Sequence, residues 1–179
     1  MHAVLDEPRS SDAATGARFG SAITCYAAGI DKKTLNNWLS RQPAVVLLTE
    51  EERREAGERN RFSFDRNRVV QIALTAELVR LGVQPRRSAM CAATFTDAAE
   101  GPGAHPHFAP RMPGELFKNA FTFLVVPPGD VAPKVVPVSA ETTVIELMHP
   151  EYGLPFSTAI VVKVDDVVDR VRAALLAGS

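Results

Sequence analysis

The stretch Cys25-Tyr-Ala-Ala-Gly-Ile-Asp-Lys-Lys-Thr-Leu-Asn-Asn-Trp-Leu-Ser40 decides how the first half of the chain folds. It is typical of a helix, a three-residue turn and a second helix. Cys25 is a small residue four positions before Gly29, so two helices can cross closely, and the glycine permits a sharp turn. Leu35 and Trp38 follow at helical spacing, which leaves polar side chains on the opposite face. The pattern predicts a helix-turn-helix.

The second helix of this motif is expected to have one buried and one solvent-facing side. Leu35, Trp38 and Leu39 should face the core. Asparagine can pair with adenine, while lysine and arginine can contact guanine or phosphate, so the outward face suggests a DNA-binding surface. The alternative is a solvated helix face without a ligand. We expect DNA base contacts from Lys33, Asn36 and Asn37, and DNA phosphate contacts from Lys32, Thr34, Arg41, Arg53, Arg54, Arg59 and Arg61.

The next segment predicts a β-hairpin beside the motif. Ala44–Leu48 is a short apolar, β-branched run, and Arg61–Phe64 alternates polar and apolar residues. Between them lies a strongly charged stretch, so strand, loop and return strand would form a wing. A competing interpretation is that Thr49 caps a short helix over residues 50–56, because three glutamates occupy its first turn.

Two further helices are expected after the wing. Asp65 is a good N-cap for a helix over residues 66–81, whose apolar residues recur at helical spacing and which Gly82 would close. Pro85 is tolerated in the first turn of a helix, so the second helix should run from residue 84 or 85 to about residue 95.

The sequences GIDKKTLNNWL (29–39) and RNRFSFDRNRVVQIALTAELVRLGVQP (59–85) resemble the DNA-binding domain of MerR-type regulators. That family combines a Thr-Leu-x-x-Trp/Tyr helix with a wing, an aromatic-rich strand and a helix that ends in Leu-Gly. The resemblance covers residues 20–96, about half of the chain, and implies a winged helix-turn-helix that binds DNA. The family's long dimerising helix and metal-sensing cysteines have no counterpart here.

The second half predicts a small α+β module, so the expected fold class is α+β with a mostly helical N-terminal half. Residues 1–19 are expected to be a mobile arm, 20–96 the DNA-binding domain, 97–114 a Pro/Gly-rich linker and 115–179 the module. Its strands should come from the runs 120–126, 134–138, 142–148 and 156–164, with a turn at 127–129. Asp165 is expected to cap a terminal amphipathic helix.

Charge distribution and composition limit the classes of function that this sequence supports. Residues 1–90 carry 14 Lys and Arg against 11 Asp and Glu, whereas residues 91–179 carry 6 against 10, so the basic half contains the helix-turn-helix. No apolar run approaches the ~18 residues of a membrane span, and the N-terminus lacks the order of a signal peptide. Cys25 and Cys91 are expected to be buried, reduced residues. We therefore expect a cytoplasmic protein without a membrane partner.

Metal, cofactor and enzyme readings find little support in the sequence. His105 and His107 are the only candidate pair of metal ligands, and no cysteine or carboxylate cluster accompanies them. Glu146 and His149 would lie on opposite faces of a strand, and no phosphate-binding loop or nucleophile elbow is present. We expect no metal, no cofactor and no catalysis.

Together these patterns favour a sequence-specific transcription regulator of bacterial or phage origin that binds double-stranded DNA. A homodimer through the C-terminal module is expected, because doubling one helix-turn-helix is the usual route to specific affinity. A small effector or a partner protein is possible in that module. Two alternatives stay open: a DNA-architecture or packaging protein of mobile elements (excisionase or small terminase subunit), and an adaptor that binds protein through its acidic wing.

Overall fold

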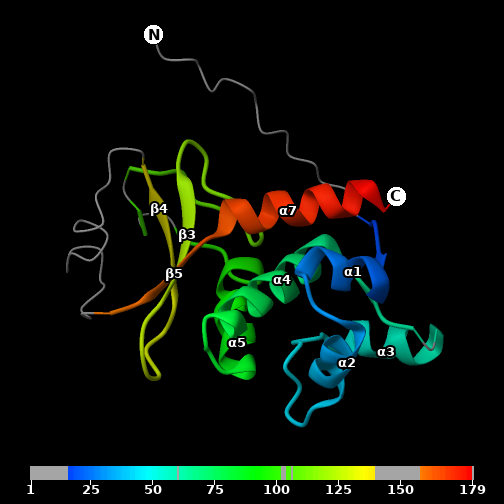
Figure 1. Cartoon of the computed structure of the whole chain (residues 1–179). Coiled ribbons are helices and arrows are strands. Elements are labelled where there is room, and N and C mark those ends of the chain that lie inside the picture. The colour runs from blue at the N-terminus through cyan, green and yellow to red at the C-terminus, as the bar shows by residue number, and fades with distance from the viewer. Residues whose placement is uncertain (1–15, 60, 102–103, 106, 140–157, 179) are drawn as a thin grey trace.

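The computed structural model describes residues 16–59, 61–101, 104–105, 107–139 and 158–178 (Figure 1). Helices and a small antiparallel sheet combine in an α+β fold, which confirms the predicted fold class. The elements in chain order are β1 (Phe19–Gly20), α1 (Ser21–Ala28), α2 (Lys32–Ser40), α3 (Glu50–Arg59), β2 (Ser63–Phe64), α4 (Arg66–Arg80), α5 (Pro85–Thr96), β3 (Phe121–Val126), β4 (Lys134–Val138), β5 (Ile160–Lys163) and α7 (Val164–Ala177).

The helix-turn-helix is formed by α1 and α2. Gly29 adopts the left-handed conformation at φ 62°, and the N–H of Ile30 bonds to the carbonyl of Cys25 at 3.0 Å. Asp31 then caps α2, because its carboxylate accepts the backbone N–H of Thr34 at 2.6 Å. The two helices are therefore separated by residues 29–31, the predicted three-residue turn.

The predicted hairpin wing is wrong, and its competing helix is confirmed. Residues 44–48 form no strand; instead the N–H groups of Val45 and Val46 bond to the carbonyl of Trp38 at 2.9 and 3.3 Å. Both valines are buried, so this apolar run serves as core beneath the end of α2 rather than as a strand. Thr49 and Glu52 form a reciprocal capping box, with N–H to side-chain distances of 2.7 and 3.1 Å, and α3 follows.

Strand β2 pairs with a segment that precedes the helix-turn-helix. Phe64 lies opposite Phe19, and Ser63 lies opposite Gly20, in an antiparallel pair. The predicted return strand therefore exists as β2, but its partner is β1, which precedes α1 in the chain. Of the predicted mobile arm, residues 1–15 lie outside the described residues, and Phe19 belongs to β1.

Helix α4 lies at the centre of the fold. Asp65 caps it as predicted, since its carboxylate accepts the N–H of Arg68 at 2.7 Å. Helices α1, α5 and α7 all pack against α4, and almost every residue from Arg68 to Leu78 is buried. The predicted helix near residues 84–95 is α5, which Pro85 begins.

The second half contributes a sheet in the order β4-β3-β5 and the long helix α7. The runs predicted at 120–126, 134–138 and 156–164 correspond to β3, β4 and β5, while the run 142–148 lies outside the described residues. Phe123 is opposite Val136 on one side and Lys163 on the other. The described residues between α5 and β3 form neither helix nor strand.

The predicted cap of the last helix is wrong. Helix α7 begins at Val164, so Asp165 lies inside its first turn rather than before it. The Asp165 carboxylate is buried and accepts the N–H of Thr122 at 2.7 Å, which ties α7 to β3. A carboxylate in the first turn still suits the helix dipole, which explains why the sequence signal was misplaced by two residues.

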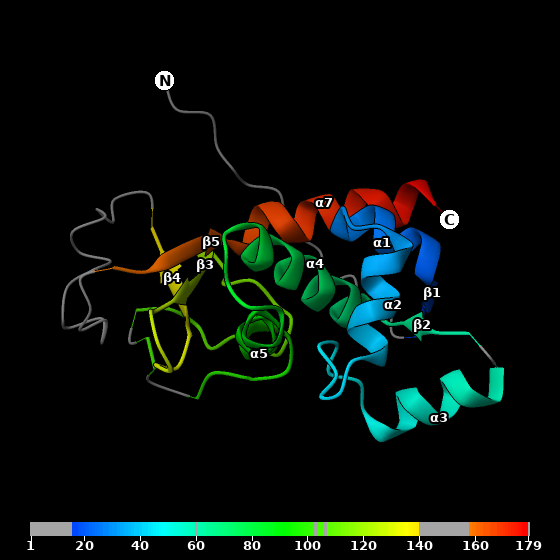
Figure 2. The same ribbon diagram turned by 60° about the horizontal axis from the view of Figure 1, so that its bottom comes forward.

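Helix α7 returns to the first half of the chain. It packs along α1 and α4 (Figures 1 and 2), and one hydrophobic core contains residues of α1, α4, α5, β3 and α7. In the part of the chain that the structure describes, no helix has both the length and the apolar character needed to cross a membrane.

Candidate nucleic-acid interface

Helix α2 presents a polar face to solvent and an apolar face to the core. Leu35 is fully buried and Trp38 is 6% exposed, and both belong to the hydrophobic core. The side chains chosen from the sequence as base contacts are all exposed, and so are most of the nearby phosphate candidates. Thr34 is half-buried, with its N–H used by the cap of the helix. The exposed residues on this face are Lys32, Lys33, Asn36, Asn37 and Arg41.

The negative charge at the start of α2 is fixed by hydrogen bonding. The backbone N–H of Thr34 donates to Asp31 and lowers the pKa of its carboxyl below the ordinary value, so Asp31 is ionised at neutral pH. It lies directly before Lys32 and Lys33. The N-terminal end of α2 therefore carries one carboxylate beside two ammonium groups, a polar arrangement that can distinguish donors from acceptors on a ligand.

The remaining phosphate candidates lie on or just after α3. Arg53, Arg54 and Arg61 are exposed, and Arg59 is the last residue of the helix. Arg53 and Arg61 come together, since both line a pocket of about 320 Å³ with Phe62. Helix α3 thus carries Arg53 and Arg54 where a charged loop was predicted. In Figures 1 and 2, α2 and α3 both lie on the side of the molecule away from the three-stranded sheet.

The acidic side chains of α3 are divided between the interior and solvent. Glu52 forms a buried ion pair with Arg68 of α4 at 3.2 Å, with each side chain 9% exposed. Glu55 pairs with Arg18 at 2.8 Å. Glu50 and Glu51 are exposed. Two carboxylates therefore attach α3 to the rest of the fold, so among these four glutamates only Glu50 and Glu51 are fully exposed.

A buried polar network continues inward from that ion pair. Arg68 also donates to the side chain of Gln71, whose amide lies 3.3 Å from the Thr96 hydroxyl and 3.2 Å from Asp97. These groups join α3 and α4 to the end of α5. Sequence analysis missed the network, because an arginine near a helix start resembles any surface charge. The spacing of Thr49 and Glu52 indicates the start of α3 but not this network.

The turn between α1 and α2 is held by an arginine from α4. Arg80 Nη2 donates to the carbonyl oxygens of Ala28 and Gly29, both at 2.9 Å. Glu77 in turn pairs with Arg80 at 2.9 Å and with Arg170 of α7 at 2.6 Å. The terminal helix is thereby connected to the turn that sets the angle of α2. The helical spacing of Glu77 and Arg80 hinted at one of these pairs, but nothing local pointed to Arg170.

Two opposing effects act on the Glu77 carboxyl. Burial alone would raise its pKa, but the hydrogen bonds and charges of Arg170 and Arg80 outweigh burial, so the pKa lies below the ordinary value. Burial raises the pKa of the Cys25 and Cys91 thiols, which are free and lie inside the core. Such thiols are poor nucleophiles and poor metal ligands at neutral pH.

The histidines do not bring a metal site together within the described residues. His105 lies against Phe117 and 3.2 Å from a carboxylate oxygen of Glu100, whereas His107 is exposed. No group of three His, Cys, Asp or Glu side chains gathers in the described part of the chain. Comparisons of the chain with protein families, with curated proteins and with solved structures give no match.

Proposed function

We propose that the protein is a sequence-specific DNA-binding regulator of transcription that places α2 in the major groove. One observation carries the proposal: α2 buries Leu35 and Trp38 and leaves Lys32, Lys33 and the two asparagines exposed. A helix of this width fits the major groove, where amide and ammonium groups can read base edges. The residues of this face are exposed, and α7 and the three-stranded sheet lie away from α2 (Figure 1).

Base contacts are assigned to Lys33, Asn36 and Asn37 in this proposal. Phosphate contacts are assigned to residues in and next to α2 and to arginines on and just after α3. These residues are Lys32, Thr34, Arg41, Arg53, Arg54, Arg59 and Arg61. Because α3 is anchored through Glu52 and Glu55, its exposed arginines are supported by a fixed helix. We further propose that the protein acts in the cytoplasm as a homodimer, without a cofactor or catalytic activity.

The proposal is tested by measuring binding to a random DNA duplex as a function of salt. Each neutralised phosphate releases counterions, so with six contacts the affinity should fall about a thousandfold between about 50 and 200 mM salt. Selection of bound fragments from the source genome would then give the preferred site and its half-site spacing. Clustered sites at one attachment or packaging locus would favour the mobile-element alternative, which uses the same surface.

A second candidate function rests on the exposed carboxylates of α3. Glu50 and Glu51 lie at the N-terminal end of this helix, where they would repel phosphate and could attract a basic protein surface. An adaptor that binds protein through α3 would show no affinity for duplex DNA even at low salt. That result would overturn the proposed DNA-binding function.

A further inference from the structure

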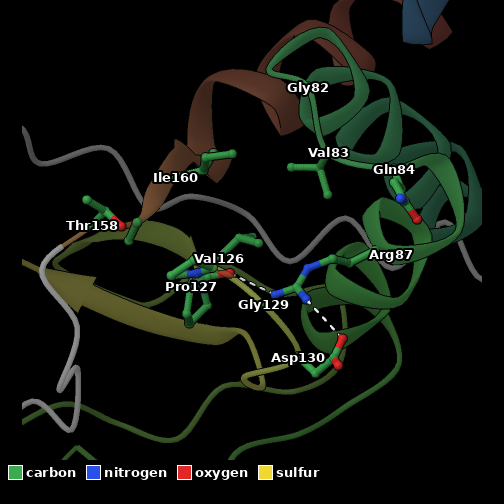
Figure 3. A pocket seen from close by; sticks show the side chains of 12 residues that line it. Gly82, Val83, Gln84, Arg87, Val126, Pro127, Gly129, Asp130, Thr158 and Ile160 are labelled. Carbon is green, nitrogen blue, oxygen red and sulfur yellow. Dashed lines mark hydrogen bonds and ion pairs between the residues drawn. The ribbon is translucent and has the colours of Figure 1, made fainter.

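A pocket of about 540 Å³ opens where the helices of the first half meet the sheet of the second (Figure 3). The turn between α4 and α5 and the first turn of α5 form one side. The turn after β3 and the start of β5 form the other. This volume lies within the range of about 300–1,000 Å³ that small-molecule sites occupy.

One wall of the pocket contains an arginine whose orientation is fixed by the protein. Arg87 Nη2 donates to the carbonyl oxygens of Pro127 and Val131, at 2.7 and 3.3 Å. Its Nη1 faces Asp130, but the distance to Oδ1 is 3.7 Å, longer than a hydrogen bond. Figure 3 shows the guanidinium between Pro127 and Asp130. The guanidinium is therefore already positioned, and its contact with Asp130 is weak because Asp130 is exposed.

Apolar side chains line the pocket on both sides of this arginine. Val83 and Ile160 face the pocket from the α4–α5 turn and from β5, and Val126 and Pro127 line it from the end of β3 (Figure 3). A rigid cationic group beside an apolar surface suits a ligand that has one anionic end and a hydrocarbon body. A carboxylate matches the planar guanidinium and can replace Asp130 with shorter, charge-assisted hydrogen bonds.

We propose that this pocket binds a small organic monocarboxylate. The carboxylate pairs with Arg87 Nη1 in place of Asp130, and the apolar body lies against Val83, Val126 and Ile160. Carboxylate binding does not require DNA binding, since its contacts come from this pocket alone. If the DNA-binding proposal fails, the pocket can still be tested in the same way.

The direct test is calorimetric titration of the full chain with hexanoate and benzoate, and with the uncharged hexanamide and benzamide. The carboxylates are expected to bind with a dissociation constant on the order of 1 mM, as befits ligands of this size in an open site. The amides should bind about tenfold more weakly or not at all, because they lack the charge that meets Arg87. Equal binding of acids and amides, or no binding of either acid, would overturn the proposal.

Three variants locate the site. Arg87→Gln should weaken hexanoate binding about tenfold or more, whereas Arg86→Gln, a change at an exposed neighbour outside the pocket lining, should leave it unchanged. Asp130→Asn removes the competing carboxylate from an exposed turn and should strengthen binding roughly two- to fivefold. This gain cannot arise from a damaged fold. Weaker binding by Asp130→Asn, or equal losses at Arg86 and Arg87, would contradict the assignment.

Discussion

At the scale of single residues, α2 shows how adjacent positions divide their roles. Leu35 is fully buried, while Asn36 next to it is exposed on the proposed DNA-facing side. Helical periodicity was enough to predict which of these side chains face inward, because the apolar positions recur every three or four residues. A base contact by Asn36 depends on the DNA that is bound, so periodicity alone does not predict it.

We expect Asn36→Ala to weaken binding to the selected DNA site by about 1–3 kcal/mol, because a bidentate pair with a base is lost. Binding to random duplex should change little, since phosphate contacts remain. Fluorescence anisotropy with both duplexes measures the two values. Asn67→Ala makes the same chemical change at an exposed position of α4 and should affect neither duplex. An equal loss on both duplexes for Asn36→Ala would place this residue away from the base edges.

Substitution by alanine is expected to lower the stability of the protein at Gly29 and to raise it at Gly57. Alanine at Gly29 would be strained at φ 62°, and its Cβ would lie 2.8 Å from Arg80 Nη2, so we expect a loss of stability of about 1–2 kcal/mol. Gly57 is an exposed residue of α3 with open space around the Cβ position, so alanine there should stabilise by up to about 1 kcal/mol. Urea unfolding measures both. A neutral Gly29→Ala would show that the turn adapts without cost.

At the scale of elements, the region between α2 and β2 was the hardest to predict. Residues 44–48 have the composition of a strand. The N–H groups of Val45 and Val46 bond instead to the carbonyl of Trp38 in α2, and both side chains are buried. Strand β2 found its partner in β1, and a two-residue strand before α1 has no distinctive pattern. Local signals did predict α3, α4 and α5, because each begins with a recognisable cap or an N-terminal proline. Strand pairing depends on distant residues and was not accessible in this way.

The attachment of α3 to α4 gives a prediction at this scale. Glu52→Gln keeps a side chain that can complete the capping box but removes the charge opposite Arg68, so a buried arginine loses its principal partner. We expect a loss of about 1–3 kcal/mol in the free energy of unfolding, because Asp97 at 3.6 Å compensates in part. Thermal and urea unfolding provide the measurement.

Glu51→Gln is the control for that variant. Glu51 is exposed and its contact with Arg54 is 3.9 Å long, so removal of its charge should change stability by less than about 0.5 kcal/mol. If both variants lost the same amount, the Glu52–Arg68 pair would have no special contribution, and α3 would be held by its apolar contacts instead.

At the scale of the whole molecule, the two halves predicted from the sequence share one core. Proline and glycine between residues 97 and 114 indicated a linker, but composition gives no information on where the chain goes afterwards. The apolar residues of α7 recur at helical spacing, so the helix itself was predictable. Its docking against α1 and α4 was not, because such packing depends on the shapes of surfaces more than 80 positions apart in the chain.

The shared carboxylate of Glu77 makes this docking sensitive to pH. Its pKa is lower in the folded protein than in the unfolded chain, so the stability it contributes is present above about pH 4.3 and is lost as the pH falls through the folded pKa. We expect Glu77→Gln to destabilise by about 1–2 kcal/mol at pH 7, since two arginines lose a charged partner. Urea unfolding between pH 7 and pH 3, values chosen to span the ordinary carboxyl range of about 4, should show the difference shrinking.

Glu115→Gln serves as the reference, because Glu115 is exposed. The free energy of unfolding of this variant should equal that of the unchanged protein across the same pH range. A constant difference between Glu77→Gln and the unchanged protein down to the lowest pH would mean that the effect is one of shape, not of charge.

The position of α7 also bears on synthesis of the protein. Ile23 of α1 lies against Gly178 at the end of α7, so the packing of α1 is completed by residues that the ribosome adds much later. N-terminal regions usually fold first as a chain emerges. Here α1 cannot complete its packing before α7 has been synthesised. A premature stop codon or a frameshift upstream of α7 would therefore impair folding of the N-terminal half as well, and the truncated product should be less stable than the intact chain.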